Sequence, residues 1–155
     1  AVLWTLSRSF KPDAVFTEEF LKALHKRMYG NVWAWAGEFR KTNKNIGVDK
    51  WQIPTELRTL LDDVKFWYAN NTYSPDECTI RFKHRLVSIH CFPNGNGRHS
   101  RLIADIVIEK IYKQLHYSWG AANLVQQGDQ RTTYLNAIRA ADAGDIQPLI
   151  NFAKS

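Results

Sequence analysis

The sequence has little cysteine, no long apolar run and no recognisable nucleic-acid motif. Its two cysteines, Cys78 and Cys91, lack metal-ligand spacing and favour reduced thiols in a cytoplasmic protein, with a single disulfide as the alternative. No run of about 20 apolar residues exists, so no membrane-spanning helix is predicted, and the start of the sequence shows no secretory signal. Zinc-finger spacing, an RNP motif and a basic zipper are also missing, so we expect no direct contact with nucleic acid.

What the chain does have is the composition of a globular protein. Its 155 residues suit one domain, and we predict a single domain over residues 1–155. Hydrophobic residues make up 45% and charged residues 23%, which argues against intrinsic disorder. With 21 Lys plus Arg against 15 Asp plus Glu, the net charge is +6, which favours anionic partners such as nucleic acid, nucleotides or acidic proteins. The basic residues are dispersed, however, so a solvated surface is the competing interpretation.

The spacing of apolar residues predicts a mostly α-helical fold. The segment after Gly97 is apolar on nearly every side and is predicted to be the central buried helix. The polar stretch from Arg40 to Ile53 has short β-like ends, so we predict a loop or a small β-hairpin there. The other expected helices run from Thr17 to Gly30, from Pro54, from a cap at Asp76, and over about 130–142 and 146–153.

The most informative stretch runs from His90 to Arg101 and joins two predicted helices. Gly95 and Gly97 lack a Cβ, so their backbone can take unusual dihedrals and approach a ligand closely. The turn leads into a helix whose first N–H groups are unpaired and attract anions. Arg98 and Arg101 lie three residues apart in that first turn, where the helix dipole disfavours a cation. We therefore expect these arginines to bind phosphate oxygens.

His90 is predicted to end the preceding helix, where it can accept a proton beside a bound phosphate. A histidine base, a glycine-rich turn and two arginines together indicate phosphoryl or nucleotidyl transfer, in which a protein mainly positions groups and neutralises charge. The Lys-Ser/Thr ending of a P-loop is missing, so the site is not of the Walker type. Taken singly, a histidine before a turn and the glycines within it are usually structural, but turn formation alone does not require the two arginines.

This stretch resembles the signature of the Fic family, H-x-F-x-[D/E]-G-N-G-R-x-x-R. The positions that match it are His90, Phe92, Gly95, Asn96, Gly97, Arg98 and Arg101. Further similarity lies in residues 32–40, 45–47 and 143–145, and the closest resemblance is to a bacterial branch called mobile mystery protein B. The resemblance implies a Fic-type helical domain with a small β-hairpin flap. It also implies transfer of AMP from ATP, with Mg²⁺, to a Ser, Thr or Tyr hydroxyl of a target protein.

The resemblance implies roles for individual residues as well. His90 would deprotonate the target hydroxyl, and Phe92 would anchor the turn in the core. The phosphate-binding and nucleotide-binding residues would be Gly95, Asn96 and Gly97 as a nest, Arg98 and Arg101 on the outer phosphates, and Tyr134 and Asp142 in the nucleoside pocket. The flap that pins the target's backbone as an added strand would consist of Lys44, Asn45, Ile46, Gly47 and Val48.

The chain departs from the family pattern in two respects. Asn94 stands where the family usually has a carboxylate that binds Mg²⁺, so either Asn94 ligates the metal weakly, or another group or a different phosphate substrate is used. No inhibitory [S/T]-x-x-x-E-[G/N] sequence is found, so we expect an inhibitory segment N-terminal to these residues or a separate antitoxin. The alternatives to AMP transfer are transfer of another phosphate-containing group, as by the kinase-like relative Doc, and a catalytically weak nucleotide-binding module.

Overall fold

The computed structural model describes residues 4–5, 8–121 and 127–155, and all regular structure within them is helical. The mostly α-helical prediction is therefore confirmed. The elements are α2 (Pro12–Val15), α3 (Glu18–Tyr29), the 3₁₀ turn η1 (Lys50–Gln52), α4 (Ile53–Asn70), α5 (Pro75–Ile89), α6 (Asn96–Ile106), the π-helical segment η2 (Val107–Ile111), α7 (Gln127–Asp142) and α8 (Gln147–Lys154).

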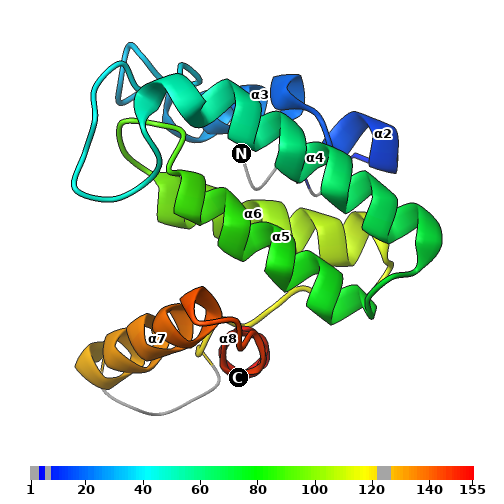
Figure 1. Ribbon diagram of the computed structural model, residues 1–155. Helices are drawn as coiled ribbons and strands as arrows, with labels where there is room; N and C mark the ends of the chain where they lie inside the picture. The colour runs from blue at the N-terminus through cyan, green and yellow to red at the C-terminus, as the bar shows by residue number, and fades with distance from the viewer. Residues whose placement is uncertain (1–3, 6–7, 122–126) are drawn as a thin grey trace.

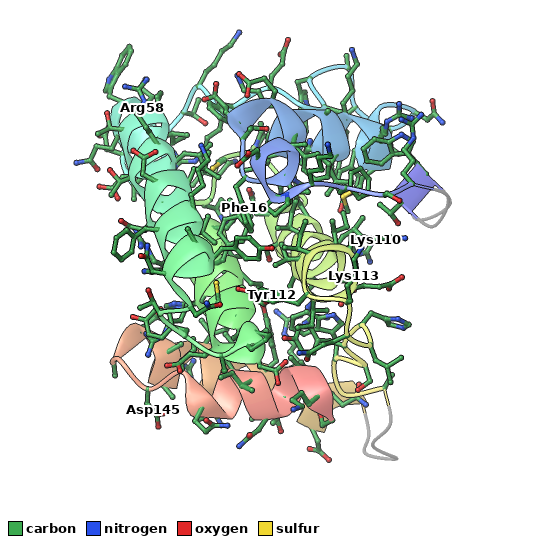
Figure 2. The ribbon with its side chains drawn as sticks, turned by 90° about the vertical axis from the view of Figure 1, so that its right-hand side faces the viewer. Phe16, Arg58, Lys110, Tyr112, Lys113 and Asp145 are labelled. Carbon is green, nitrogen blue, oxygen red and sulfur yellow. The ribbon has the colours of Figure 1, made fainter. Side chains whose placement is uncertain are left out.

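The helices form three layers, with α5 and α6 in the middle (Figure 1). On one side α4 packs along α5 and α3 packs on α6, and on the other side α8 contacts α5 and carries α7. Figure 2 shows Phe16 and Tyr112 pointing into the interior between these layers, whereas Arg58 and Asp145 point outward. The pair α5 and α6 thus contributes to two apolar clusters, and the turn that joins them packs into the first through Cys91 and Phe92.

The predicted central helix is α6 together with η2. Ile103, Ala104 and Val107 are completely buried, and Ile108 is nearly so. At Val107 the helix widens into a π-helical turn that ends at Ile111. The apolar pattern therefore predicted the burial correctly but not this change in helix type.

The helix boundaries agree with the predictions to within about three residues, α7 beginning at Gln127 instead of about 130, but the cap at the start of α5 differs. Thr17 caps α3 by accepting a hydrogen bond from the Phe20 N–H, as its position before two glutamates indicated. The predicted cap Asp76 is wrong, because the side chain of Ser74 accepts the Glu77 N–H at this end. Asp76 instead accepts the Tyr117 hydroxyl at 2.8 Å and pairs with Lys154 at 2.9 Å, and thus ties α5 to the last helix.

Of the two alternatives predicted between Arg40 and Ile53, the loop is confirmed and the small β-hairpin is not, because this stretch is an irregular loop that leads into η1. Side-chain hydrogen bonds, and not a strand ladder, join the two sides of this loop. The Asn43 side-chain amide donates to the Asp49 carboxylate at 3.1 Å and accepts the Lys50 N–H at 2.8 Å. Carbonyl groups of the loop accept hydrogen bonds from the side chain of Arg40. Acceptors held in this way are not free to pair across a hairpin.

Two further observations bear on the whole described chain. In the part of the chain that the structure describes, no helix is long and apolar enough to cross a membrane. Cys78 and Cys91 are both buried free thiols, which agrees with the prediction of reduced cysteines.

Candidate active site

The turn between α5 and α6 carries the predicted site, and its two ends both have left-handed backbone. His90 caps the C-terminus of α5 with φ 57° and ψ 60°. Gly95 precedes α6 with φ 78°. The left-handed region costs a residue with a Cβ roughly 1–2 kcal/mol, whereas glycine adopts it freely. The conformation of His90 must therefore be held in place by its neighbours.

Phe92 anchors the middle of this turn in the core, as predicted. Its side chain is 1% exposed, and its ring stacks on the imidazole of His25 with centroids 3.8 Å apart. The Asn96 side chain clamps Phe92 from the helix side, accepting the Phe92 N–H at 3.0 Å and donating to the Phe92 carbonyl at 2.7 Å. The side-chain amide of Asn96 is thus used within the turn, so its backbone N–H, and not its side chain, remains as a donor for a phosphate.

His25 fixes the turn a second time through hydrogen bonds. Its Nδ1 accepts the Gly37 N–H at 2.9 Å, so the proton of the neutral ring lies on Nε2, which donates to the Asn94 carbonyl at 3.0 Å. Burial lowers the pKa of His25, which favours this neutral form, and the hydrogen bond to Asn94 opposes the shift. At Gly95 the ring of Tyr29 leaves no room, because a Cβ there would lie 2.5 Å from a ring carbon.

The N-terminus of α6 has the properties of an anion site. The backbone N–H groups of its first residues have no acceptor within the helix and point away from its end. Gly97 and Arg98 are exposed, and no acidic side chain occupies the first turn. The exposed end thus combines free donors with the positive end of the helix dipole, the arrangement that binds phosphate.

A hollow of about 660 Å³ opens beside this end, between α6 and the helices that follow. Arginines and aromatic rings dominate its wall, and they come from Arg98, Arg101, Arg131, Trp119, Tyr134 and Phe152. No acidic residue is among the described residues that line it. Guanidinium groups bind phosphate oxygens, and aromatic rings provide flat faces for a base, so the hollow suits a nucleotide.

The two motif arginines are placed differently in this wall. Arg98 is exposed, whereas Arg101 is half-buried. The guanidinium carbon of Arg101 lies 4.4 Å from the ring centroid of Tyr134 and 5.6 Å from that of Trp119. Stacking on two rings limits the rotation of Arg101, so it presents its N–H groups in a defined direction.

His90 itself lies at the other end of the turn and is half-buried. Its pKa is lowered first by burial and then by the positive charges of Arg40 and Lys44, and a hydrogen bond with the Val87 backbone opposes the shift. A histidine with a lowered pKa is neutral at pH 7 and can accept a proton, which is the state a general base needs.

Of the two residues predicted in the nucleoside pocket, the structure brings only one to the hollow. Tyr134 lines it, and its hydroxyl accepts a hydrogen bond from the buried Lys83. The Asp142 carboxylate instead contacts His84 Nε2 at 2.7 Å and is not among the residues that line the hollow. Asp142 lies two turns farther along α7, about 12 Å from Tyr134.

Sequence reasoning missed two buried cations next to the site, Arg40 and Lys83, which are 3% and 0% exposed. For Lys83 a signal was present, because Thr79, Lys83 and Leu86 have the spacing of one helix face and both neighbours are buried. Arg40 carries no such signal, since it lies in an irregular stretch and its partners are distant in the sequence.

Position 94 does not offer the donor set of a magnesium site. The Asn94 side-chain oxygen already accepts the Gly95 N–H at 2.8 Å, and its backbone oxygen accepts from His25. The described residues contain no group of three or more His, Cys, Asp or Glu side chains placed to hold a metal ion. Mg²⁺ prefers several oxygen ligands with carboxylates among them, so the chain's own residues do not fit this ion here.

Fold and site together define a class: helical proteins in which a histidine at a helix end, a glycine-rich turn and arginines on the next helix form a phosphate-binding site. Residues 15–108 match the model of the Fic/DOC family. The match covers more than half of the chain, and the chain therefore belongs to the Fic/DOC family.

Solved structures of Fic proteins share the fold. The chain aligns over 99% of its length, and 45% of the other chain, with Fic-1 from C. elegans at a TM-score of 0.76 and 22% identity. BepC from Bartonella tribocorum, solved with bound AMPPNP, aligns over 99% of this chain and 78% of its own at a TM-score of 0.71 and 19% identity.

The curated relatives are larger proteins. The proteins named protein adenylyltransferase Fic from Drosophila grimshawi and Aedes aegypti are 29% and 27% identical over 133 and 146 residues. These alignments cover 83% and 92% of this chain but only 26% and 28% of the relatives. The chain thus spans about a quarter of the length of these proteins. Its similarity to the mobile mystery protein B branch stays a prediction.

Proposed function

We propose that this protein transfers AMP from ATP to a Ser, Thr or Tyr hydroxyl of a target protein. The observation that carries the proposal is the joint placement of a half-buried His90, whose pKa is lowered, and an electropositive hollow at the two ends of one turn. The names of the adenylyltransferase relatives support the same reaction. The similarity to nucleotide-bound BepC supports a nucleotide as the ligand.

In the proposed reaction, the exposed end of α6 binds the phosphates through the N–H groups of Asn96, Gly97 and Arg98. Arg98 and Arg101 neutralise the phosphate charge, and Tyr134 contributes to the nucleoside wall. His90 takes the proton of the target hydroxyl as its oxygen attacks the α-phosphorus. The bond to the β-phosphate oxygen breaks, and pyrophosphate leaves. No step is assigned to a metal ion held by the chain.

The target protein is the partner of residues 44–48, the predicted flap. This loop lies at the same end of the helices as the motif turn, and the Val48 N–H donates to the Ile89 carbonyl at 3.3 Å (Figure 1). We propose that the loop holds the target's backbone beside His90. A cytoplasmic location and control by an inhibitory segment or an antitoxin belong to the same proposal.

The test is incubation of the protein and a cell lysate with ATP labelled at the α- or the γ-phosphate. We expect label on protein from α-labelled ATP only, and none with His90→Ala, which should still bind ATP because His90 does not line the hollow. Label from γ-labelled ATP only would mean a kinase of the Doc type. Label from neither would favour a nucleotide-binding module, and activity in His90→Ala would remove His90 as the base.

The role of position 94 has its own test. Asn94→Asp adds a carboxylate on the exposed side of the turn, so we expect transfer to reach half its maximal rate at a lower Mg²⁺ concentration. The measurement is a Mg²⁺ titration of α-label transfer for both proteins. Identical titration curves would mean that position 94 does not face the metal that accompanies ATP.

A further inference from the structure

One buried arginine outside the motif joins the two parts of the proposed site. Arg40 is 3% exposed, and within the described residues no Asp or Glu forms an ion pair with it. Backbone carbonyl groups take the place of a carboxylate. A guanidinium group has five N–H donors in a planar fork, so one side chain can hold several carbonyls at once.

Three of the groups that Arg40 binds are consecutive in the chain and surround His90. Its Nε donates to the His90 carbonyl at 2.6 Å, its Nη2 donates to the Ile89 carbonyl at 3.3 Å, and its backbone N–H donates to the Cys91 carbonyl at 2.9 Å. These carbonyls belong to the last residue of α5 and the two residues after it, and they lack helical partners. Arg40 thereby supplies the contacts that hold His90 in its left-handed conformation.

The other contacts of Arg40 reach the predicted flap. Nη1 donates to the Thr42 carbonyl at 3.0 Å, and Nη2 donates to the Val48 carbonyl. Between them, Gly47 has φ 92°, and a Cβ there would lie 2.7 Å from His90 Cβ and 2.9 Å from Nη2 of Arg40. The loop is thus packed directly against the histidine, and Arg40 lies between both segments.

The charge of Arg40 acts on the same histidine. Arg40 and Lys44 are the two cations that lower the pKa of His90 after burial, and the Val87 backbone contact raises it. Removing the positive charge of Arg40 would therefore move the imidazole toward its protonated form, which cannot act as a base.

We propose that Arg40 is a positioning residue that holds the general base and the target-binding loop in one fixed arrangement, through the carbonyls of residues 42, 48, 89 and 90. The proposal rests on the proposed function, because it assigns His90 and the loop their roles in the transfer of AMP. Arg40 itself is not among the residues that line the hollow.

The experiment compares the unmodified protein with Arg40→Met and Arg40→Lys, with Lys41→Met as the control for the loss of an adjacent, exposed cation. Circular dichroism first selects conditions in which each variant is folded. NMR then follows the imidazole signals of His90 against pH and the hydrogen exchange of the Val48 amide. Initial rates of α-label transfer give kcat, the KM for ATP and the pH profile.

In Arg40→Met we expect the pKa of His90 to rise and the Val48 amide to exchange faster. We also expect kcat to fall about 100-fold, as a base displaced by an ångström would cause, with little change in the KM for ATP. Arg40→Lys keeps the positive charge but loses the planar guanidinium group. In this variant we therefore expect the pKa of His90 to stay close to that of the unmodified protein, while the Val48 amide exchanges faster. Lys41→Met should match the unmodified protein in every measurement.

Unchanged His90 titration and Val48 exchange in both folded variants would overturn the proposal, as would a loss that appears only in the KM for ATP. Titration and exchange need no turnover, so they separate this inference from the proposed function. If they shift as expected but the unmodified protein transfers no AMP, the positioning of His90 stands and the assigned reaction falls. Should Arg40→Met not fold, Arg40→Lys alone decides through the same two NMR measurements.

Discussion

The motif turn is flanked by two buried cations that are compensated in different ways. On the side of the loop, Arg40 is surrounded by the carbonyls of residues 42, 48, 89 and 90. On the side of α7, Lys83 has the Tyr134 hydroxyl as its hydrogen-bond partner and lies near the rings of Tyr134 and Trp119. Burial and the nearby charge of Arg101 lower the pKa of Lys83 to about 7.

The difference shows that two equally buried cations can differ in how firmly they hold their proton. Carbonyl dipoles replace the hydration of a guanidinium group, and arginine remains charged in proteins. An ammonium group with a single phenolic oxygen and aromatic neighbours loses more hydration than it regains, so it gives up its proton more easily. Arg40 therefore carries a permanent charge, whereas the charge of Lys83 depends on pH.

The largest expected effect is the loss of stability in Arg40→Met. The substitution removes the side-chain donor from one buried and three part-buried carbonyls, and an unpaired buried carbonyl costs about 1–3 kcal/mol, so we expect a loss of about 3 kcal/mol. Urea denaturation followed by circular dichroism measures the free energy of unfolding. Lys41→Met removes an exposed cation one position away and should change it by about 0.5 kcal/mol or less. Equal losses in both variants would show that the carbonyls around Arg40 find water instead.

The contrast between loop and helix also explains what the sequence could predict. The helices α4 and α5 follow from apolar residues at local spacing, and the motif turn follows from glycines and arginines within twelve positions. The hairpin prediction failed because the deciding contacts join Arg40 to the end of α5, 49 and 50 residues away. Local patterns carry no information about such partners.

The same limit applies to single polar residues. Ser74 and Asp76 are both good helix caps. Pro75, which suits the first helical position, favours Ser74 locally, and Asp76 is engaged by its distant partners Tyr117 and Lys154. For Lys83, the spacing of neighbouring residues predicts a place on the buried face of α5. Its hydrogen-bond partner Tyr134 lies far away in the sequence and could not be predicted. Sequence thus predicted the turn, but not the residues that hold the turn in place.

The next largest expected effect is the pH dependence of stability that Lys83 causes, which Lys83→Met should remove. The pKa of Lys83 is about 7 in the folded protein against an ordinary 10.5, so the unfolded chain binds more protons between these values. Stability of the unmodified protein should therefore rise with pH in this window, by about 1 kcal/mol from pH 7.5 to 8.5, relative to Lys83→Met. Denaturation of both proteins at the two pH values gives this difference.

The matched control for this measurement is Lys65→Met, which removes an exposed lysine of α4. Its stability should stay parallel to that of the unmodified protein over the same pH range. Parallel curves for Lys83→Met as well would mean that Lys83 keeps its proton when the chain folds, and the two buried cations would then behave alike.

The smallest effect separates the ring of Tyr134 from its hydroxyl. Tyr134→Phe keeps the ring that stacks on Arg101 but removes the oxygen that accepts from Lys83. We expect a loss of about 1 kcal/mol in stability, because the hydroxyl no longer accepts hydrogen bonds from Lys83 and Arg101. ATP affinity by calorimetry should stay nearly unchanged, whereas Tyr134→Leu, which also removes the aromatic face beneath Arg101, should weaken it. If Tyr134→Phe weakened ATP binding as much as Tyr134→Leu, the hydroxyl and not the ring would serve the nucleotide, and Lys83 would belong to the binding site.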